Sequence, residues 1–159
     1  MDQKNELAHK LDVLCQIAAA LNGRQITWAV GASVLLYFKG IVEDFHDLDL
    51  LVAAEDFHRA AELLQNLGQL QVTPPNSQYE SKFFHEFLVD GVEVDIMGGC
   101  TVRRNGRETE CFVLKNEDIQ GCVDLKGQQI PLHSVPVWRG YYEAMGRDSK
   151  VALIDGLKI

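Results

Sequence analysis

Hydrophobic positions divide the chain into a helical beginning, a central region of short apolar runs, and a helical end. Over residues 4–22 apolar side chains recur every three or four positions, which predicts an amphipathic helix that stops near Gly23. Similar spacing, with glycines as stop signals, predicts further helices over residues 34–38, 55–67, 137–145 and 147–157.

Short apolar or alternating runs predict strands over residues 26–30, 48–53, 82–89, 92–97, 101–104, 107–113 and 130–133, with a short edge strand closed by Val72. Asp90-Gly91 and Asn105-Gly106 predict two tight hairpin turns, and residues 73–77 predict a loop. The helix over 55–67 lies between strands, which favours a βα crossover. The expected fold class is therefore α/β (α+β), a mixed sheet of about five to six strands with helices mainly on one side.

The length of 159 residues predicts a single domain. We expect an N-terminal helix over 1–23, a catalytic-type core over 24–135, and short C-terminal helices over 136–159. Hydrophobic residues make up 47% of the chain and charged residues 24%, which is typical of a folded globular protein.

The net charge of −8 disfavours binding to duplex nucleic acid or to an anionic membrane. A phosphate-bearing ligand would need a metal or a local basic patch. The four cysteines form no C-x-x-C pair, and neither a signal segment nor an apolar stretch of membrane-spanning length is present in the sequence. We expect a cytoplasmic protein with free thiols and no membrane partner.

Three acidic residues and one turn are the candidate chemistry. Asp47 and Asp49 precede an apolar run, and in a strand they project from one face, where two carboxylates can share a divalent cation. Asp95 lies in a strictly alternating strand, where a solvated sheet face would explain it equally well. The turn Gly31-Ala32-Ser33 joins a strand to a helix, so its N–H groups and the Ser33 hydroxyl can hold a phosphate. Each signal alone is weak: an acidic loop before a strand and a Gly-x-Ser turn are both common.

Taken together, these pieces resemble the nucleotidyltransferase superfamily of the DNA polymerase β type, and in particular its small bacterial single-domain members. The resemblance rests on a Gly-x-Ser turn, an interval over residues 34–46, an Asp-x-Asp strand start and a third acid on a later strand. It covers residues 26–97, and it extends to the segment from Met145 to Lys150, which looks like the Gly-Arg-x-Lys-Asp segment of those members.

The resemblance implies a site and a function. Asp47, Asp49 and Asp95 would be catalytic residues and would hold Mg²⁺ or Mn²⁺, because hard cations take oxygen ligands. The turn of Gly31, Ala32 and Ser33, together with Lys82 and Lys150, would contact the triphosphate. The implied activity is transfer of an NMP group from an NTP such as ATP to the hydroxyl of a small molecule or partner protein.

Two departures from the family pattern favour an alternative. Glu43 and Phe45 occupy positions where many small members carry Arg and Thr, and the chain adds only two short helices where relatives have a helical domain. A homodimer, a partner protein or a small acceptor would then complete the site. The alternative function is a catalytically inactive binding module of the same fold, such as one half of a toxin–antitoxin-like pair. A phosphatase is disfavoured, because its Asp-x-Asp pair follows the apolar run and here the pair precedes it.

Overall fold

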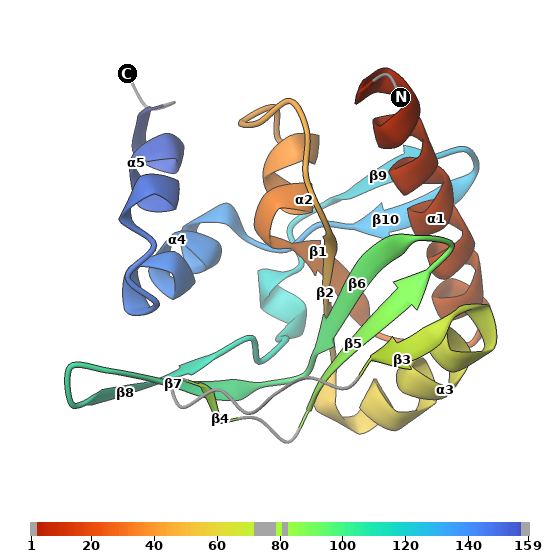
Figure 1. Ribbon diagram of the computed structural model, residues 1–159. Helices are drawn as coiled ribbons and strands as arrows, with labels where there is room; N and C mark the ends of the chain where they lie inside the picture. Colours follow the sequence, from red (N-terminus) through yellow and green to blue (C-terminus); the bar gives the residue numbers. More distant parts are fainter. Residues whose placement is uncertain (1–2, 72–78, 81–82, 157–159) are drawn as a thin grey trace.

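Five strands pair into one mixed sheet, in the spatial order β1 (Trp28–Gly31), β2 (Leu48–Val52), β6 (Val92–Met97), β5 (Phe84–Val89) and β3 (Gln69–Gln71). The structure is a computed structural model that describes residues 3–71, 79–80 and 83–156 (Figure 1). Strand β2 runs parallel to β6 and antiparallel to β1, while β5 runs antiparallel to β6 and to β3. The predicted mixed sheet and α+β class are confirmed.

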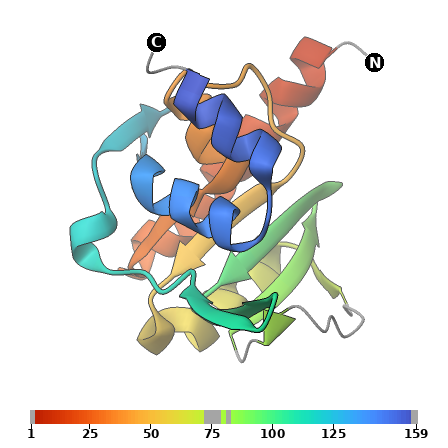
Figure 2. The same ribbon diagram turned by 90° about the vertical axis from the view of Figure 1, so that its left-hand side faces the viewer.

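Two smaller sheets and five helices complete the described chain. One small sheet contains β4 (Tyr79–Glu80), β7 (Cys100–Arg104) and β8 (Arg107–Cys111), and the other contains β9 (Cys122–Leu125) and β10 (Gln128–Pro131). The α-helices are α1 (Gln3–Gly23), α2 (Ala32–Phe38), α3 (Phe57–Leu67), α4 (Val135–Ala144) and α5 (Asp148–Gly156). Helices α4 and α5 lie together, away from α1 and α3 (Figures 1 and 2).

From Val92 to Ile96, strand alternation gives β6 an apolar face and an acidic one. In β6, Val92, Val94 and Ile96 are buried, whereas Glu93 is exposed and Asp95 is half-buried. The apolar residues join one core with Leu14 of α1 and Phe57 of α3. Burial of one face leaves the opposite face of β2 and β6 to carry the acidic residues.

Most predicted elements are present within a few residues of their expected bounds. Val89 pairs with Val92 across the predicted turn at Asp90-Gly91, and Arg104 pairs with Arg107 across Asn105-Gly106. The strand β9 was not predicted, because its residues are exposed or half-buried and show no apolar run. Val72 and the predicted loop over residues 73–77 lie outside the described residues. In the part of the chain that is described, no helix combines the length and apolar character needed to cross a membrane.

Candidate active site

Adjacent parallel strands bring the three candidate carboxylates together. Asp49 of β2 is in register with Asp95 of β6, so both side chains project from the same face of the sheet. Asp47 lies just before β2, and one ligand oxygen from each of the three residues lies within 4.8 Å of the others. Whether the three residues bind a metal stays a prediction.

Burial and neighbouring acidic residues raise the pKa of Asp49 and of Asp95. Burial, followed by the charges of Asp47 and Asp95, raises the pKa of Asp49 well above its ordinary value. Burial, followed by the charges of Asp47 and Glu86, raises the pKa of Asp95 to about 7. A divalent cation would relieve this repulsion. The donor set is composed of carboxylate oxygens, which suits Mg²⁺ or Mn²⁺ and not a metal that prefers sulfur or imidazole.

The predicted turn lies beside the carboxylates. Gly31 is in register with Asp49 across β1 and β2. A Cβ atom added at Gly31 would lie 2.3 Å from the Trp138 ring, so the residue must be glycine for helix α4 to pack there. Ala32 has a φ of 51°, a left-handed conformation that glycine adopts more readily. The Ser33 hydroxyl oxygen accepts a hydrogen bond from Lys150 Nζ at 3.2 Å, which joins α5 to the turn.

Two residues near the site were not among the predicted site residues. Tyr142 of α4 hydrogen-bonds Ser33, and burial, reinforced by the charge of Asp49, raises its pKa above the ordinary value. Arg147 stands over the Tyr142 ring, with its guanidinium carbon 5.9 Å from the ring centroid, and its positive charge opposes the rise in the pKa of Asp49. The Gly146-Arg147 dipeptide of the family-like segment could have indicated Arg147, whereas no local pattern indicated Tyr142.

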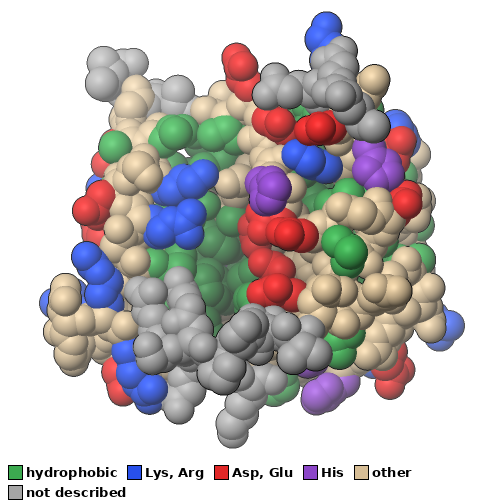
Figure 3. Space-filling model, viewed as in Figure 1, with side chains coloured by type: hydrophobic (Ala, Val, Ile, Leu, Met, Phe, Trp, Pro, Cys, Tyr) green, Lys and Arg blue, Asp and Glu red, His purple; other side chains and the backbone are tan. Residues whose placement is uncertain are grey.

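Basic and acidic side chains stand on opposite sides of a hollow in the face shown in Figure 3. Arg147 and Lys150 supply positive charge beside the turn, and Arg104 of β7 packs its guanidinium against Gly146. The carboxylates of β2 and β6 supply the negative charge. The basic side chains would attract an anionic ligand, and the carboxylates would attract a cation bound to that ligand.

Three other positions were singled out in the sequence, namely Lys82, Glu43 and Phe45. Lys82 lies outside the described residues. Glu43 is exposed, whereas Phe45 is buried, with its ring centroid 5.3 Å from that of Tyr37 and Lys10 Nζ 5.6 Å from its own centroid. Phe45 is therefore part of the packing that holds the loop before β2.

Known structures share this arrangement of elements. No protein-family profile and no curated protein matches the sequence. A candidate nucleotidyltransferase from Thermotoga maritima matches with a TM-score of 0.71 and 22% identity, over 99% of this chain and 94% of its own. The lincosamide antibiotic adenylyltransferase LnuA, in its lincomycin-bound form, matches with a TM-score of 0.55 and 16% identity, over 82% of this chain and 84% of its own.

A further match is the enzyme ANT(2″)-Ia in complex with adenylyl-2″-tobramycin, with a TM-score of 0.56 and 11% identity, over 85% of this chain and 77% of its own. At these identities the likeness concerns the fold. The chain shares the fold of these nucleotidyltransferase and adenylyltransferase structures, which is the fold that the resemblance of its motifs implied.

Proposed function

We propose that the chain is a metal-dependent nucleotidyltransferase that transfers an NMP group from an NTP to a hydroxyl acceptor. The observation that carries the proposal is the convergence of Asp47, Asp49 and Asp95 beside the turn whose Ser33 accepts a hydrogen bond from Lys150 of α5. The folds of LnuA and of ANT(2″)-Ia support it, since the first is described as an adenylyltransferase and the second was solved in complex with adenylyl-2″-tobramycin.

In this proposal all three acids bind the metal, and Asp95 also accepts a proton. Asp47, Asp49 and Asp95 would hold Mg²⁺ or Mn²⁺, which when bound neutralises charge on the phosphates. The acceptor oxygen forms a bond to the α-phosphorus, the bond from that phosphorus to the pyrophosphate oxygen breaks, and pyrophosphate leaves. Asp95, which is in register with Asp49 on the neighbouring strand, accepts the proton of the acceptor hydroxyl.

The opposite side of the site binds the departing phosphates. Lys150 and Ser33 already share a hydrogen bond, and the turn from Gly31 to Ser33 adds backbone N–H groups at the start of α2. Arg147 places a further positive charge beside Asp49. These groups neutralise the negative charge that develops as pyrophosphate leaves.

A catalytically inactive binding module is the second candidate, and Glu43 and Phe45 favour it. Phe45 cannot donate or accept a hydrogen bond through its side chain where many small family members have a hydroxyl. Such a module would retain the fold and lose metal-dependent turnover.

Calorimetric titration with a non-hydrolysable ATP analogue, with and without Mg²⁺, tests the proposal. The wild-type protein is expected to bind only with the metal, and Asp47→Asn and Asp49→Asn to weaken binding by about tenfold or more, because each removes a ligand charge. Glu62→Gln is the matched control, since Glu62 is an exposed acid on α3 and its substitution removes the same charge elsewhere.

Equal binding by Asp47→Asn and Glu62→Gln would overturn the proposed site. Metal-dependent binding without release of pyrophosphate from ATP, in the presence of any hydroxyl acceptor tried, would favour the inactive module instead.

A further inference from the structure

Two buried cysteines face each other in the small sheet of β4, β7 and β8. Cys100 of β7 and Cys111 of β8 lie directly opposite in the antiparallel register, so their side chains project from the same face of the hairpin. Both thiols are free, and Cys100 is 8% exposed whereas Cys111 is fully buried. Neither cysteine belongs to the proposed active site, and the proposed reaction does not use them.

The spacing of directly opposite residues suits a disulfide. In an antiparallel pair, opposite Cα atoms lie about 4.5–5.5 Å apart, within the range of about 4.4–6.8 Å that disulfides span. Opposite Cβ atoms also lie about 4.5–5.5 Å apart, and a disulfide requires about 3.5–4.5 Å, so the two strands must approach by about 1 Å. A disulfide formed in this way retains some strain, and strained disulfides are readily reduced. The pair therefore suits a reversible link.

The residue after the pair connects it to helix α4. Phe112 follows Cys111 and has a φ of 65°, which is uncommon for a residue other than glycine. The centroid of its ring lies 5.3 Å from that of Trp138 and 5.1 Å from that of Tyr141, both on α4. Because Phe112 is buried among these rings, an approach of β8 towards β7 moves its side chain against the indole.

We propose that Cys100 and Cys111 form a reversible cross-strand disulfide, and that its formation changes the packing of Phe112 against Trp138. The oxidant is a low-molecular-weight disulfide. The thiolate of Cys100, the more exposed cysteine, attacks one sulfur of this oxidant, and the other half leaves as a thiol after taking up a proton. The thiolate of Cys111 then attacks the Cys100 sulfur, and the first half leaves as a second thiol. The cysteines lose two electrons and two protons, which the two released thiols gain.

Burial makes this reaction slow. Burial, followed by the charge of Cys111, raises the pKa of Cys100 to about 12. Burial, followed by the charge of Glu110, raises the pKa of Cys111 to about 11. Since the thiolate is the attacking form, the reduced pair is the resting state and the disulfide forms only when the oxidant persists.

Prolonged incubation with 2-hydroxyethyl disulfide tests the proposal. The protein carries Cys15→Ser and Cys122→Ser, which remove the other two thiols. After digestion without reductant by trypsin, which cleaves at the arginines between the pair, mass spectrometry is expected to find the Cys100 and Cys111 peptides linked. Dithiothreitol added to the folded protein is expected to abolish the link.

The two indole N–H resonances in a ¹H–¹⁵N NMR spectrum report the structural consequence. The resonance of Trp138 is expected to shift on oxidation and to return on reduction. That of Trp28, whose Nε1 donates a hydrogen bond to Asn22 Oδ1 at 2.9 Å, is expected to stay unchanged, because this indole packs against α1 and not against Phe112. A Trp28→Phe variant assigns the two signals.

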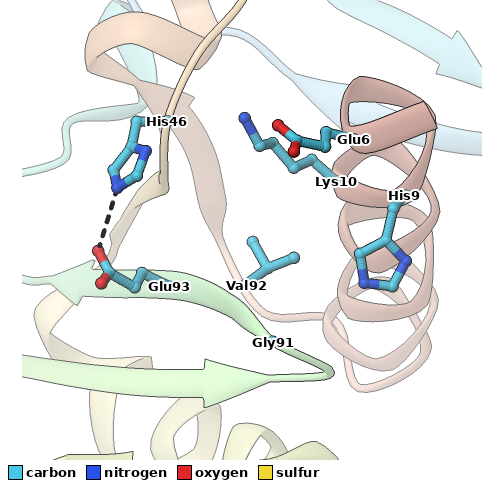
Figure 4. A pocket seen from close by; sticks show the side chains of 7 residues that line it. All are labelled: Glu6, His9, Lys10, His46, Gly91, Val92 and Glu93. Atoms are coloured by element: carbon cyan, nitrogen blue, oxygen red, sulfur yellow. Dashed lines mark ion pairs between the residues drawn. The ribbon is translucent and has the colours of Figure 1, made fainter. Parts of the chain in front are cut away.

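The opposite end of β6 offers a second internal control. A cavity lies there between α1 and the β5–β6 hairpin, and the described residues that line it include no cysteine (Figure 4). The backbone amide resonances of Gly91, Val92 and Glu93, which line this cavity, are expected to stay unchanged on oxidation. A shift that appears equally at these amides and at the Trp138 indole would be a general effect of the reagent and would overturn the proposed local change.

Cys100→Ala in the same background is the matched variant, because it leaves only the fully buried thiol of Cys111. It is expected to show neither the linked peptides nor the shift of Trp138, and Cys111→Ala takes its place if it does not fold. Four results would overturn the inference: no linked peptides, a link that dithiothreitol does not reduce, an unmoved Trp138 resonance in the oxidised protein, or an equal shift in the matched variant.

Discussion

At the scale of single residues, Gly31 sets how closely α4 can approach the sheet. Its missing side chain leaves room for the indole of Trp138, which is itself buried. A Cβ at this position would lie 2.3 Å from Trp138 Cζ2 and 2.6 Å from Nε1, closer than non-bonded atoms approach a real Cβ. The indole cannot move without displacing the core around it.

We therefore expect Gly31→Ala to lower the free energy of unfolding by about 1–3 kcal/mol, the usual cost of overpacking. Urea unfolding followed by fluorescence measures it. Gly23→Ala is the matched control, because a Cβ there has no atom within 4 Å. The smaller side chain of Trp138→Leu should recover part of the loss in the double variant. Equal stability of the two alanine variants would contradict this account.

Asp56 holds the start of β1 to the segment before α3. Its Oδ2 accepts a hydrogen bond from the Thr27 backbone N–H at 3.0 Å, and its Oδ1 lies 2.5 Å from Arg59 Nη2. The backbone hydrogen bond, followed by that from Arg59, lowers the pKa of this buried carboxyl. The stabilisation is present above the unfolded-state pKa of about 3.9 and is lost as the pH falls through the lower folded-state pKa.

We expect Asp56→Ala to cost about 1.5–3 kcal/mol at neutral pH, as for hydrogen bonds to a charged group. The difference from wild type should shrink in acid, since the wild-type carboxylate then becomes protonated. Urea titrations at several pH values measure it, and a difference that stays constant into acid would show that the loss has another cause. Asp12→Ala, which removes an exposed pair with Lys126, serves as control and is expected to cost about 1 kcal/mol or less.

Local sequence patterns predicted several residues of the candidate site and missed others. The period of two in a strand was enough to place Asp47 with Asp49 and to single out Asp95. The turn Gly31-Ala32-Ser33 was visible as a local pattern. Tyr142 was not, because its contact with Ser33 joins residues far apart in the chain, and no local spacing encodes such a pairing.

At the scale of elements, local turn chemistry determined which hairpins could be predicted. Asn105-Gly106 and Asp90-Gly91 have strong turn preferences, and both residues of each pair have positive φ. The β9–β10 turn uses Lys126 and Gly127, both also at positive φ, and lysine carries no such preference. Strand order was equally inaccessible, because the parallel pairing of β2 with β6 depends on the path of the intervening chain.

An ion pair attaches α5 to α4 and so positions a residue of the proposed phosphate site. Arg139 Nε donates to Asp155 Oδ1 at 2.7 Å and its Nη2 to Oδ2 at 2.8 Å, a bidentate pair that links the two helices. Helix α5 also carries Lys150, which reaches Ser33. The pair thus positions an amine of the proposed phosphate site.

Arg139→Gln is therefore expected to raise amide hydrogen exchange over residues 150–155 and to weaken binding of the ATP analogue about twofold to tenfold, while Mg²⁺ binding stays unchanged. Hydrogen-exchange mass spectrometry and calorimetry measure the two effects. Glu143→Gln provides the control, because it removes only the 3.3 Å contact between Arg139 and Glu143 on the same helix. Faster exchange without weaker analogue binding would exclude Lys150 from the phosphate site.

At the scale of the whole molecule, the acidic cluster opposes folding until its charge is neutralised. Asp49 is half-buried beside two further carboxylates, and its raised pKa indicates that its charged form is disfavoured in the folded chain. Without metal, Asp49→Asn should therefore raise the melting temperature at neutral pH by about 2–8 °C, which corresponds to about 1–2 kcal/mol for a chain of this size.

Addition of Mg²⁺ should stabilise the wild-type protein by about 2.7 kcal/mol at one hundred times its dissociation constant. It should stabilise Asp49→Asn much less. Calorimetric melting with and without metal measures both effects, with Glu62→Gln expected to behave like wild type. If Mg²⁺ and Mn²⁺ leave the wild-type melting temperature unchanged and Asp49→Asn lowers it, the three carboxylates are held by protein contacts alone. The nucleotidyltransferase fold would then serve a function without metal.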